Sequence, residues 1–285
     1  MSGFKYLRAV VTGGAGGIGG AIARALAARG ARVAVTDLFQ EKAVAAAQAL
    51  GGGARGYRCD VTDRQEAEGI AAAVARDFGG IDLVFANAGV WVGGRLTEIE
   101  PREFDWLFDV NVRGAFNTVQ AFVPLLLQQA AAGGRARFIL TGSENSVGVP
   151  TTAFMTAYTA TKHAVLAMAD GLRRDLDGTG VGVSLLCPGP VNTGIWDARR
   201  ARHDRYGGAA VADPELAAVV SKQLAAHGQH PDETARLCLE GVANDEFMII
   251  TDPTMRAYAS ARQREVTAAL DRLDARLSAT HGSRP

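Results

Sequence analysis

The sequence predicts an α/β protein in which a doubly wound parallel sheet of about seven strands carries helices on both faces. Two observations carry this prediction. Short β-branched runs alternate along the chain with longer alanine-rich segments, and most of the runs are continuously apolar and bounded by Gly, Asp or Asn. Continuous apolar runs are typical of strands buried on both faces, and strand–helix alternation with short connections produces right-handed crossover units.

The predicted elements follow one another without a break in the middle of the chain. We expect strands at Arg8–Thr12, Arg32–Thr36, Arg55–Asp60, Ile81–Ala86, Arg137–Thr141, Val181–Cys187 and Phe247–Ile250. We expect helices at Ile18–Arg29, Gln40–Leu50, Arg64–Phe78, Arg102–Gln129 and Thr156–Leu176. Residues 1–253 are therefore predicted to form a single domain. Within it, residues 188–231 form an irregular stretch whose length is typical of a lid or binding loop.

Beyond that domain, residues 254–285 are predicted to form a helical tail. One face of its helix carries an apolar row made of Met255, Ala259, Val266, Leu270, Leu273 and Leu277. We expect this row to pack on its own subunit or on a neighbouring one, because an apolar helix face is stable when it is covered.

Composition narrows the classes of protein that this chain can be. The 285 residues include 34 glycines, and 30 Lys plus Arg balance 30 Asp plus Glu, so the formal net charge is 0. The 48% of hydrophobic residues exclude a disordered chain, and the absence of a positive surplus argues against a nucleic-acid partner. No stretch reaches the roughly 18 apolar residues of a membrane span. Three widely spaced cysteines suggest neither a disulfide framework nor a metal site. We expect a cytoplasmic protein.

A glycine-rich loop, T-G-G-A-G-G-I-G at residues 12–19, follows the first predicted strand and precedes the first predicted helix. Glycine lets the backbone turn tightly and approach a pyrophosphate, and the helix N-terminus offers free amides to the phosphates. The spacing of Gly13, Gly17 and Gly19 differs from the G-x-G-x-x-G pattern. A P-loop is excluded because no Gly-Lys-Ser/Thr follows. The loop therefore predicts a dinucleotide site.

Asp37, which follows the second predicted strand, indicates the cofactor. An acid at this offset can accept hydrogen bonds from both hydroxyls of the adenosine ribose, and it would repel a 2′-phosphate. Neither Gly16 nor Leu38 supplies a positive charge that could bind such a phosphate. The sequence thus favours NAD over NADP. Asp60 and Asn87, at the ends of the next two strands, extend the row of ligand-facing residues.

Tyr158 and Lys162 lie four residues apart near the start of a predicted helix, and that spacing puts both on one face. An ammonium beside a phenol favours the phenolate and lowers the tyrosine pKa from about 10. Tyrosine can then act as a general acid or base near neutral pH.

Taken together, these features resemble the short-chain dehydrogenase/reductase family, in its single-domain, NAD-preferring branch. The similarity extends from about Arg8 to Ile250. Its motifs are T-G-G-A-G-G-I-G (12–19), D-V (60–61), N-A-G (87–89), N-V-R-G (111–114), T-G-S (141–143), Y-T-A-T-K (158–162) and P-G-P-V-N-T (188–193). The resemblance implies a Rossmann-like fold and NAD(P)-dependent interconversion of alcohols and carbonyls by an Asn-Ser-Tyr-Lys tetrad.

The resemblance also implies a role for each member of the tetrad. Tyr158 donates or removes the proton at the substrate oxygen, while Lys162 lowers the pKa of Tyr158 and binds the nicotinamide ribose. Ser143 hydrogen-bonds the substrate oxygen, and Asn111 holds a water in a proton relay to Lys162. The implied cofactor site comprises Gly13, Gly16, Gly17, Ile18, Asp37, Leu38, Asp60, Val61, Asn87, Gly89, Tyr158, Lys162, Pro188, Gly189, Val191 and Thr193.

The chain departs from the family pattern at two places. The family serine commonly precedes the tyrosine by about thirteen residues, whereas Ser143 lies fifteen before Tyr158. We attribute the difference to a two-residue insertion in 147–155, and Ser146 is the competing candidate. The family often has a glycine pair after its last strand, where this chain has Thr251-Asp252-Pro253 and the tail.

The residues that follow the later strands suggest the kind of substrate. Trp91, Phe154, Met155 and Trp196, together with Ser143, are predicted to bind it, and their character favours an apolar or aromatic secondary alcohol or ketone. The run from Arg199 to Arg205 would either meet an anionic substrate tail or form a solvated helix face. The sequence and tail are loosely similar to family members that oxidise the benzylic alcohol of lignin-derived aromatics.

Other functions stay open at this point. The same fold could serve as a catalytically inactive NAD-binding scaffold or sensor, although the intact tetrad argues against it. A nucleotide-sugar epimerase usually needs a larger C-terminal domain, and a methyltransferase would not explain Tyr158 and Lys162. We expect a homodimer or homotetramer with no nucleic-acid, membrane or metal partner.

Overall fold

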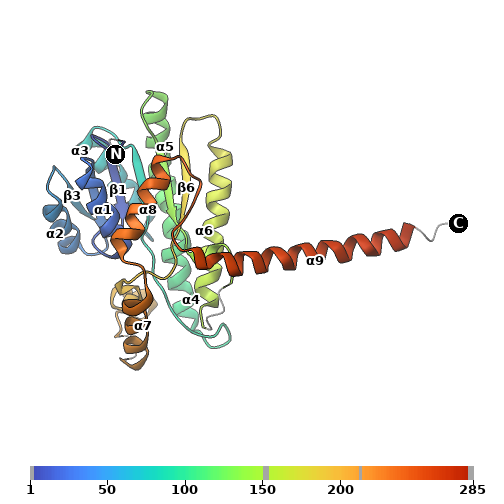
Figure 1. The fold of residues 1–285 in the computed structure, drawn as a ribbon. Helices are drawn as coiled ribbons and strands as arrows, with labels where there is room; N and C mark the ends of the chain where they lie inside the picture. The colour runs from blue at the N-terminus through green and yellow to red at the C-terminus, as the bar shows by residue number, and fades with distance from the viewer. Residues whose placement is uncertain (1–2, 150–153, 212–213, 282–285) are drawn as a thin grey trace.

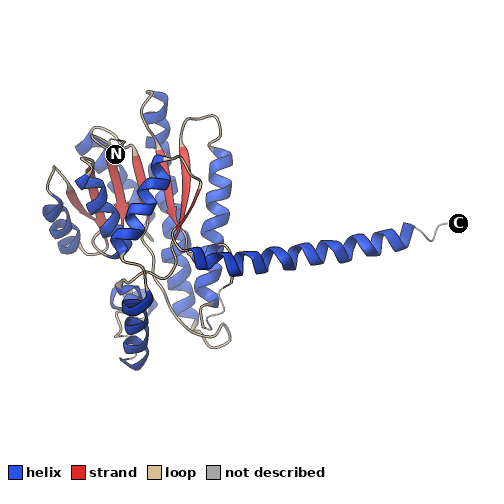
Figure 2. Ribbon diagram, viewed as in Figure 1, coloured by secondary structure: helices blue, strands red, loops and turns tan. Residues whose placement is uncertain are grey.

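The computed structural model describes residues 3–149, 154–211 and 214–281, and its centre is one seven-stranded parallel sheet (Figures 1 and 2). The strand order is β3-β2-β1-β4-β5-β6-β7. The strands are β1 (Arg8–Thr12), β2 (Arg32–Asp37), β3 (Arg55–Arg58), β4 (Leu83–Ala86), β5 (Arg137–Thr141), β6 (Gly182–Cys187) and β7 (Met248–Ile250). The predicted fold class is confirmed. The order reverses direction between β1 and β4, which is where ligands bind in such sheets.

Helices cover both faces of the sheet (Figure 2). They are α1 (Gly17–Ala28), α2 (Gln40–Leu50), α3 (Arg64–Phe78), α4 (Pro101–Phe108), α5 (Gly114–Ala131), α6 (Thr156–Asp175), α7 (Pro214–His227), α8 (Pro231–Ala243) and α9 (Arg256–His281). Successive residues of β1 point to opposite faces: Val10 belongs to the apolar cluster under α3, α5 and α6, and Val11 to the one under α1, α2 and α8. Burial on both faces explains why the central strands are mostly apolar, whereas the edge strand β3 is partly exposed and carries two arginines.

The helix predicted at Arg102–Gln129 is interrupted. A π-helical turn, Asp109–Arg113, separates α4 from α5. Such turns frequently occur at functional sites, because they redirect the side chains that follow. Here the turn carries Asn111, which is 2% exposed and contacts the loop after β4.

The prediction that residues 188–231 are irregular is wrong in part. The region contains two short 3₁₀ segments, Gly194–Ala201 and Asp204–Tyr206, and the helix α7. The helix α8 was not expected either. Both α7 and α8 begin at a proline, Pro214 and Pro231, which is a helix-start signal present in the sequence.

The tail forms the predicted helix, but of the two expected arrangements the packing on its own subunit is not found. Beyond its first turn, α9 projects away from the rest of the described chain (Figure 1). Met255 is buried, whereas Val266, Leu270 and Leu273 are 47%, 55% and 46% exposed. The row is therefore not covered by its own subunit. Within the described residues, no helix is both long and apolar enough to cross a membrane.

Candidate active site

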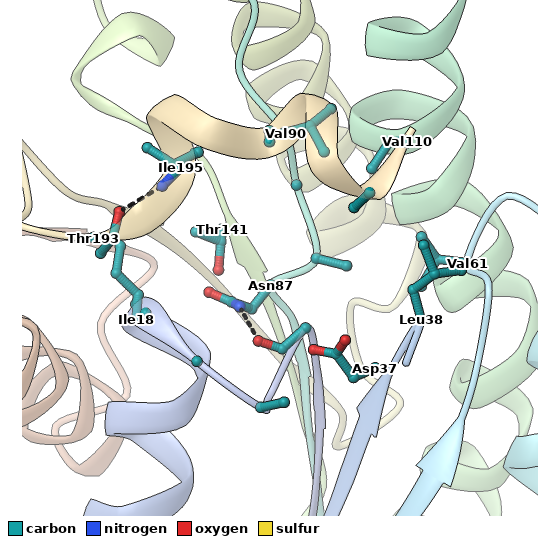
Figure 3. Close-up of a pocket in the computed structure, with 18 of the residues that line it drawn as sticks. Ile18, Asp37, Leu38, Val61, Asn87, Val90, Val110, Thr141, Thr193 and Ile195 are labelled. Atoms are coloured by element: carbon teal, nitrogen blue, oxygen red, sulfur yellow. Dashed lines mark hydrogen bonds between the residues drawn. The ribbon is translucent and has the colours of Figure 1, made fainter. Parts of the chain in front are cut away.

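A cleft of about 400 Å³ opens at the carboxyl ends of the strands, where the sheet order reverses (Figure 3). The loops after β1, β2, β4 and β5 form its floor, and α6 and the segment Gly194–Ala201 form its walls. The structure brings all the predicted cofactor residues to this cleft except Gly189 and Val191. Val191 is buried beneath it, and a Cβ on Gly189 would overlap with the Asp252 carboxylate, so these two residues lie behind the lining.

The glycine-rich loop is held in a shape that side chains cannot adopt. Gly13 and Gly17 have φ values of 60° and 53°, in the left-handed region that favours glycine. A Cβ on Gly19 would overlap with the Gly13 carbonyl oxygen and lie 2.5 Å from Asn87 Nδ2. Helix α1 begins within this motif, at Gly17, with no side-chain cap from Gly16, so the amides of its first turn are available to an anion.

Asn87 fastens this loop to the end of β4. Its Nδ2 donates to the carbonyl oxygens of Thr12 at 3.1 Å and Gly13 at 3.4 Å (Figure 3). In return, the Thr12 hydroxyl accepts from the backbone N–H groups of Asn87 and Ala88, each at 3.0 Å. The two strands on either side of the switch point are thus tied together at the cleft floor.

Acidic side chains lie at one end of the cleft. Asp37 Oδ1 accepts from the Phe39 N–H at 3.2 Å, which fixes the carboxylate at the end of β2 (Figure 3). Asp60 Oδ1 is held in the same way by the N–H and hydroxyl of Thr62. Lys42 also lines the cleft, but its ammonium lies 4.5 Å from the centre of the Phe39 ring.

Tyr158 and Lys162 lie on the first turns of α6 and both line the cleft. Lys162 Nζ donates to the Thr141 carbonyl at 2.9 Å and lies 5.6 Å from the centre of the Tyr158 ring. The expectation that the pKa of Tyr158 falls is wrong for this structure. Burial raises the pKa of Tyr158 to about 12, although hydrogen bonding with Ser143 acts in the opposite direction. Burial likewise lowers the pKa of Lys162 to about 8.

The two candidate serines have different surroundings on the turn after β5. Ser146 is 1% exposed; its hydroxyl donates to the Lys162 carbonyl at 2.8 Å and accepts from the Ser143 N–H. Ser146 therefore holds the turn to α6, and neither Ser146 nor Ser143 is among the residues that line the cleft. Ser143 is the serine whose hydroxyl lies next to Tyr158. The insertion was expected within 147–155, and residues 150–153 of that stretch lie outside the described residues.

Asn111 joins the loop after β4 to α6. Its Oδ1 accepts from the Val90 N–H at 2.8 Å, and its Nδ2 donates to the Val90 carbonyl and the Thr161 hydroxyl. Both amide hydrogens are thus used within the protein. The side chain therefore connects these two elements, and its oxygen can still accept from a water, so the predicted relay stays a prediction.

The predicted substrate residues are distributed more widely than expected. Trp91 and Met155 pack in the apolar cluster that contains Tyr158. Phe154 is 50% exposed, with φ at 69°. Trp196 faces a neighbouring groove between the segment Gly194–Ala201 and α7, together with Lys222.

The apolar wall of the cleft comes instead from α4 and the π-helical turn, which do not lie at the ends of strands. Trp106 and Val110 lie one helical turn apart on α4 and the π turn, and both line the cleft with Val90 and Ile195 (Figure 3 labels the last three). Their four-residue spacing is the signal that could have identified them. Thr141 also lines the cleft, and its buried hydroxyl makes no hydrogen bond within the described chain.

The arginine run from Arg199 to Arg205 has a structural use that the sequence did not reveal. Arg199 and Arg202 both pair with Glu103 on α4, at 2.5 Å and 3.0 Å. Burial raises the pKa of Glu103, but the two guanidinium groups outweigh it and lower the pKa below its ordinary value. The pairs hold the segment over the cleft, so these two arginines bind the Glu103 carboxylate and form neither a fully solvated helix face nor a site for an anionic substrate tail.

The comparisons with known proteins agree with this geometry. A family model described as short chain dehydrogenase matches residues 8–204. The chain is 30% identical over 260 residues to the C alpha-dehydrogenase of Sphingobium sp. (strain NBRC 103272 / SYK-6), spanning 90% of this chain and 84% of the relative. It is 37% identical over 223 residues to the 1-deoxy-11-beta-hydroxypentalenate dehydrogenase of Streptomyces avermitilis, spanning 76% and 80%. A solved short chain dehydrogenase/reductase from Burkholderia phymatum, in complex with NAD, matches with a TM-score of 0.85 at 31% identity, covering 94% of this chain and 97% of that one.

Proposed function

Since this chain belongs to the short-chain dehydrogenase family, we propose that it transfers a hydride between NAD(H) and a secondary alcohol or ketone. The observation that carries the proposal is one cleft that holds both the glycine cradle of β1–α1 and the pair Tyr158 and Lys162, with Ser143 beside the tyrosine. An enzyme of this type is an NAD-dependent alcohol dehydrogenase or carbonyl reductase.

The cleft fits a dinucleotide. The glycines leave room for a ligand against the backbone, the uncapped start of α1 suits a pyrophosphate, and Asp37 suits a ribose with free hydroxyls. Bound NAD supplies a hydride acceptor at its nicotinamide. The preference for NAD over NADP is proposed from the Asp37 carboxylate, which would repel a 2′-phosphate, and the complex of the Burkholderia phymatum relative with NAD supports it.

The chain's own residues manage the proton. Tyr158 removes the proton from the substrate hydroxyl during oxidation and returns it during reduction. Because burial holds the pKa of Tyr158 near 12, the phenolate needs nearby positive charge, and the Lys162 ammonium, 5.6 Å from the centre of the Tyr158 ring, supplies it. The segment Gly194–Ala201, held by Glu103, covers the cleft and limits the access of water.

The substrate is proposed to be apolar or aromatic. Val90, Trp91 and Met155 pack in the apolar cluster that contains Tyr158, and an apolar wall binds apolar groups by removing their surface from water. Two relatives whose names identify them as dehydrogenases, one of them a C alpha-dehydrogenase, support this class of reaction.

The test is a panel of aryl and aliphatic secondary alcohols incubated with NAD, with NADH absorbance as the readout. We expect turnover of at least one aryl alcohol, and loss of that turnover in Tyr158→Phe while NAD still binds. Turnover that survives Tyr158→Phe would contradict the assigned role. NAD binding without turnover of any compound would support a catalytically inactive scaffold or sensor instead.

We also propose that the protein is a homodimer or homotetramer, with α9 as one contact. Val266, Leu270 and Leu273 recur at spacings of four and three, which is the narrow seam that one helix offers to another. Light scattering should report a smaller assembly for the double variant Leu270→Asp, Leu273→Asp than for the unchanged chain. Ala268→Asp, Ala275→Asp places the same charges on the opposite face and serves as the control; equal masses for both variants would exclude this contact. A cytoplasmic location stays a prediction.

A further inference from the structure

Three buried side chains form a chain of hydrogen bonds that ends at Ser143. The Thr159 hydroxyl donates to Asn145 Oδ1 at 2.6 Å, and Asn145 Nδ2 donates to Ser143 Oγ at 3.2 Å. Thr159, Asn145 and Ser143 are 5%, 1% and 7% exposed. None of the three lines the cleft in this structure, but Ser143 hydrogen-bonds Tyr158, which does line it.

This series of hydrogen bonds has a direction, because the Asn145 side-chain amide donates through its nitrogen and accepts through its oxygen. Thr159 donates to the oxygen end, so the nitrogen end faces Ser143 and donates to it. A hydroxyl that accepts from this side keeps its single hydrogen for another partner. Ser143 is therefore left with its hydrogen available on the side of Tyr158 and the cleft.

The turn itself does not need Asn145. Its backbone is held by the Glu144 N–H, which donates to the Pro188 carbonyl, and by the Ser146 hydroxyl between Ser143 and Lys162. The Glu144 carboxylate further accepts from the Tyr258 hydroxyl at the start of α9. In contrast, both hydrogen bonds of the Asn145 side chain belong to the path from Thr159 to Ser143.

We propose that Asn145, oriented by Thr159, is a positioning residue that keeps Ser143 as a hydrogen-bond donor to the substrate oxygen. The proposal rests on the proposed dehydrogenase function. Negative charge develops on that oxygen as hydride and proton move, and a donor already aimed at it stabilises the transition state without reorganisation. A serine that turned its hydrogen towards residue 145 would present only lone pairs to that charge.

The test compares two replacements that retain the shape of a side chain and change its hydrogen bonding. Asn145→Asp places a carboxylate that accepts from Ser143, so kcat should fall by ~100-fold, as on loss of an oxyanion donor. Thr159→Val releases the Asn145 amide, and kcat should fall by a smaller factor that Thr159→Ser restores. NAD affinity should be retained in all three. Thr118→Val is the matched control, because Thr118 is also a buried helix threonine but bonds only to the Gly114 carbonyl.

A double-mutant cycle with Ser143→Ala separates positioning from a general structural effect. If Asn145 acts through Ser143, then Asn145→Asp costs little further kcat once Ser143 is alanine. A full additional loss in that background, or Thr159→Val activity equal to that of the unchanged enzyme, overturns the proposal. Should the unchanged enzyme turn over no alcohol, the proposed function itself fails; an active enzyme with additive losses refutes only the positioning role.

Discussion

The shape of the glycine-rich loop leads to a prediction about a single methyl group. The Cβ of Gly19→Ala would overlap with the Gly13 carbonyl oxygen and lie 2.5 Å from Asn87 Nδ2, about 0.9 Å short of the 3.4 Å at which ordinary contact begins. Asn87 would have to leave its hydrogen bonds to Thr12 and Gly13, or the loop would have to move. Overpacking of this kind costs ~1–3 kcal/mol.

Part of that cost is offset, because alanine is a better helix former than glycine by ~1 kcal/mol. We therefore expect Gly19→Ala to lower the free energy of unfolding by up to ~2 kcal/mol, which corresponds to a fall in Tm of up to ~8 °C. NAD affinity should fall by at least ~tenfold, which is a loss of ~1.4 kcal/mol, since the displaced loop is the one that would hold the pyrophosphate.

Gly20→Ala is the matched control, one residue further along the same helix. Its Cβ would meet nothing closer than 3.5 Å, so only the helix propensity changes and the Tm should rise slightly. The assays are thermal unfolding and NAD titration followed by fluorescence. A Gly19→Ala protein that melts as high as Gly20→Ala and binds NAD within twofold of the unchanged chain would refute the reasoning.

Three further predictions concern the rest of the cleft. Asp37→Ala should lower the affinity for NAD and reduce the preference for NAD over NADP by ~tenfold, because it removes a charged hydrogen-bond acceptor and a charge that repels the 2′-phosphate. Titration with the two cofactors measures both affinities. Tighter binding of NADP than of NAD by the unchanged chain would contradict this prediction. Glu103→Gln should lower the free energy of unfolding by ~1–3 kcal/mol, because two partly or fully buried guanidinium groups lose their counter-charge. The region around Arg199 and Arg202 should then be cleaved faster by trypsin. An unchanged cleavage rate would show that Glu103 does not hold this region in place. For Lys162, the folded-state pKa of about 8 lies below the ordinary value of 10.5, so the unfolded chain binds more protons between these limits and stability should rise as pH increases from 8 to 10. In urea titrations, Lys162→Met should show a smaller rise in stability over this pH range. Equal rises for the variant and the unchanged chain would show that Lys162 does not cause the pH dependence.

The parts of the fold that could be predicted from the sequence are those encoded by neighbouring residues. The apolar runs predicted the strands because parallel strands are buried on both faces, and the loop at residues 12–19 predicted a tight, glycine-dependent turn. Tyr158 and Lys162 were brought to one cleft because their spacing is a property of the helix itself. The interrupted helix at Asp109–Arg113 was missed because a π turn leaves no comparable local pattern.

Contacts between distant segments could not be predicted in this way. Glu103 lies 96 residues from Arg199, and nothing in either local sequence identifies the other as its partner. The same is true of Trp106 and Val110, which enter the cleft only because α4 packs beside the loop after β4. The uncovered seam of α9 is a further case, since a sequence predicts an apolar row without identifying the surface that covers it.

The pKa of Tyr158 depends both on local sequence spacing and on contacts between distant segments. Spacing alone predicted a lowered pKa, because it counts the neighbouring ammonium and not the burial that the rest of the fold imposes. In the structure burial dominates, and the tyrosine stays protonated far above neutral pH. A site whose acid–base group is difficult to ionise depends more strongly on donors that stabilise negative charge on the substrate oxygen and on Tyr158. The direction of the Ser143 hydroxyl therefore matters more here than it would beside an exposed tyrosine, and Asn145 and Thr159 are the residues that fix that direction.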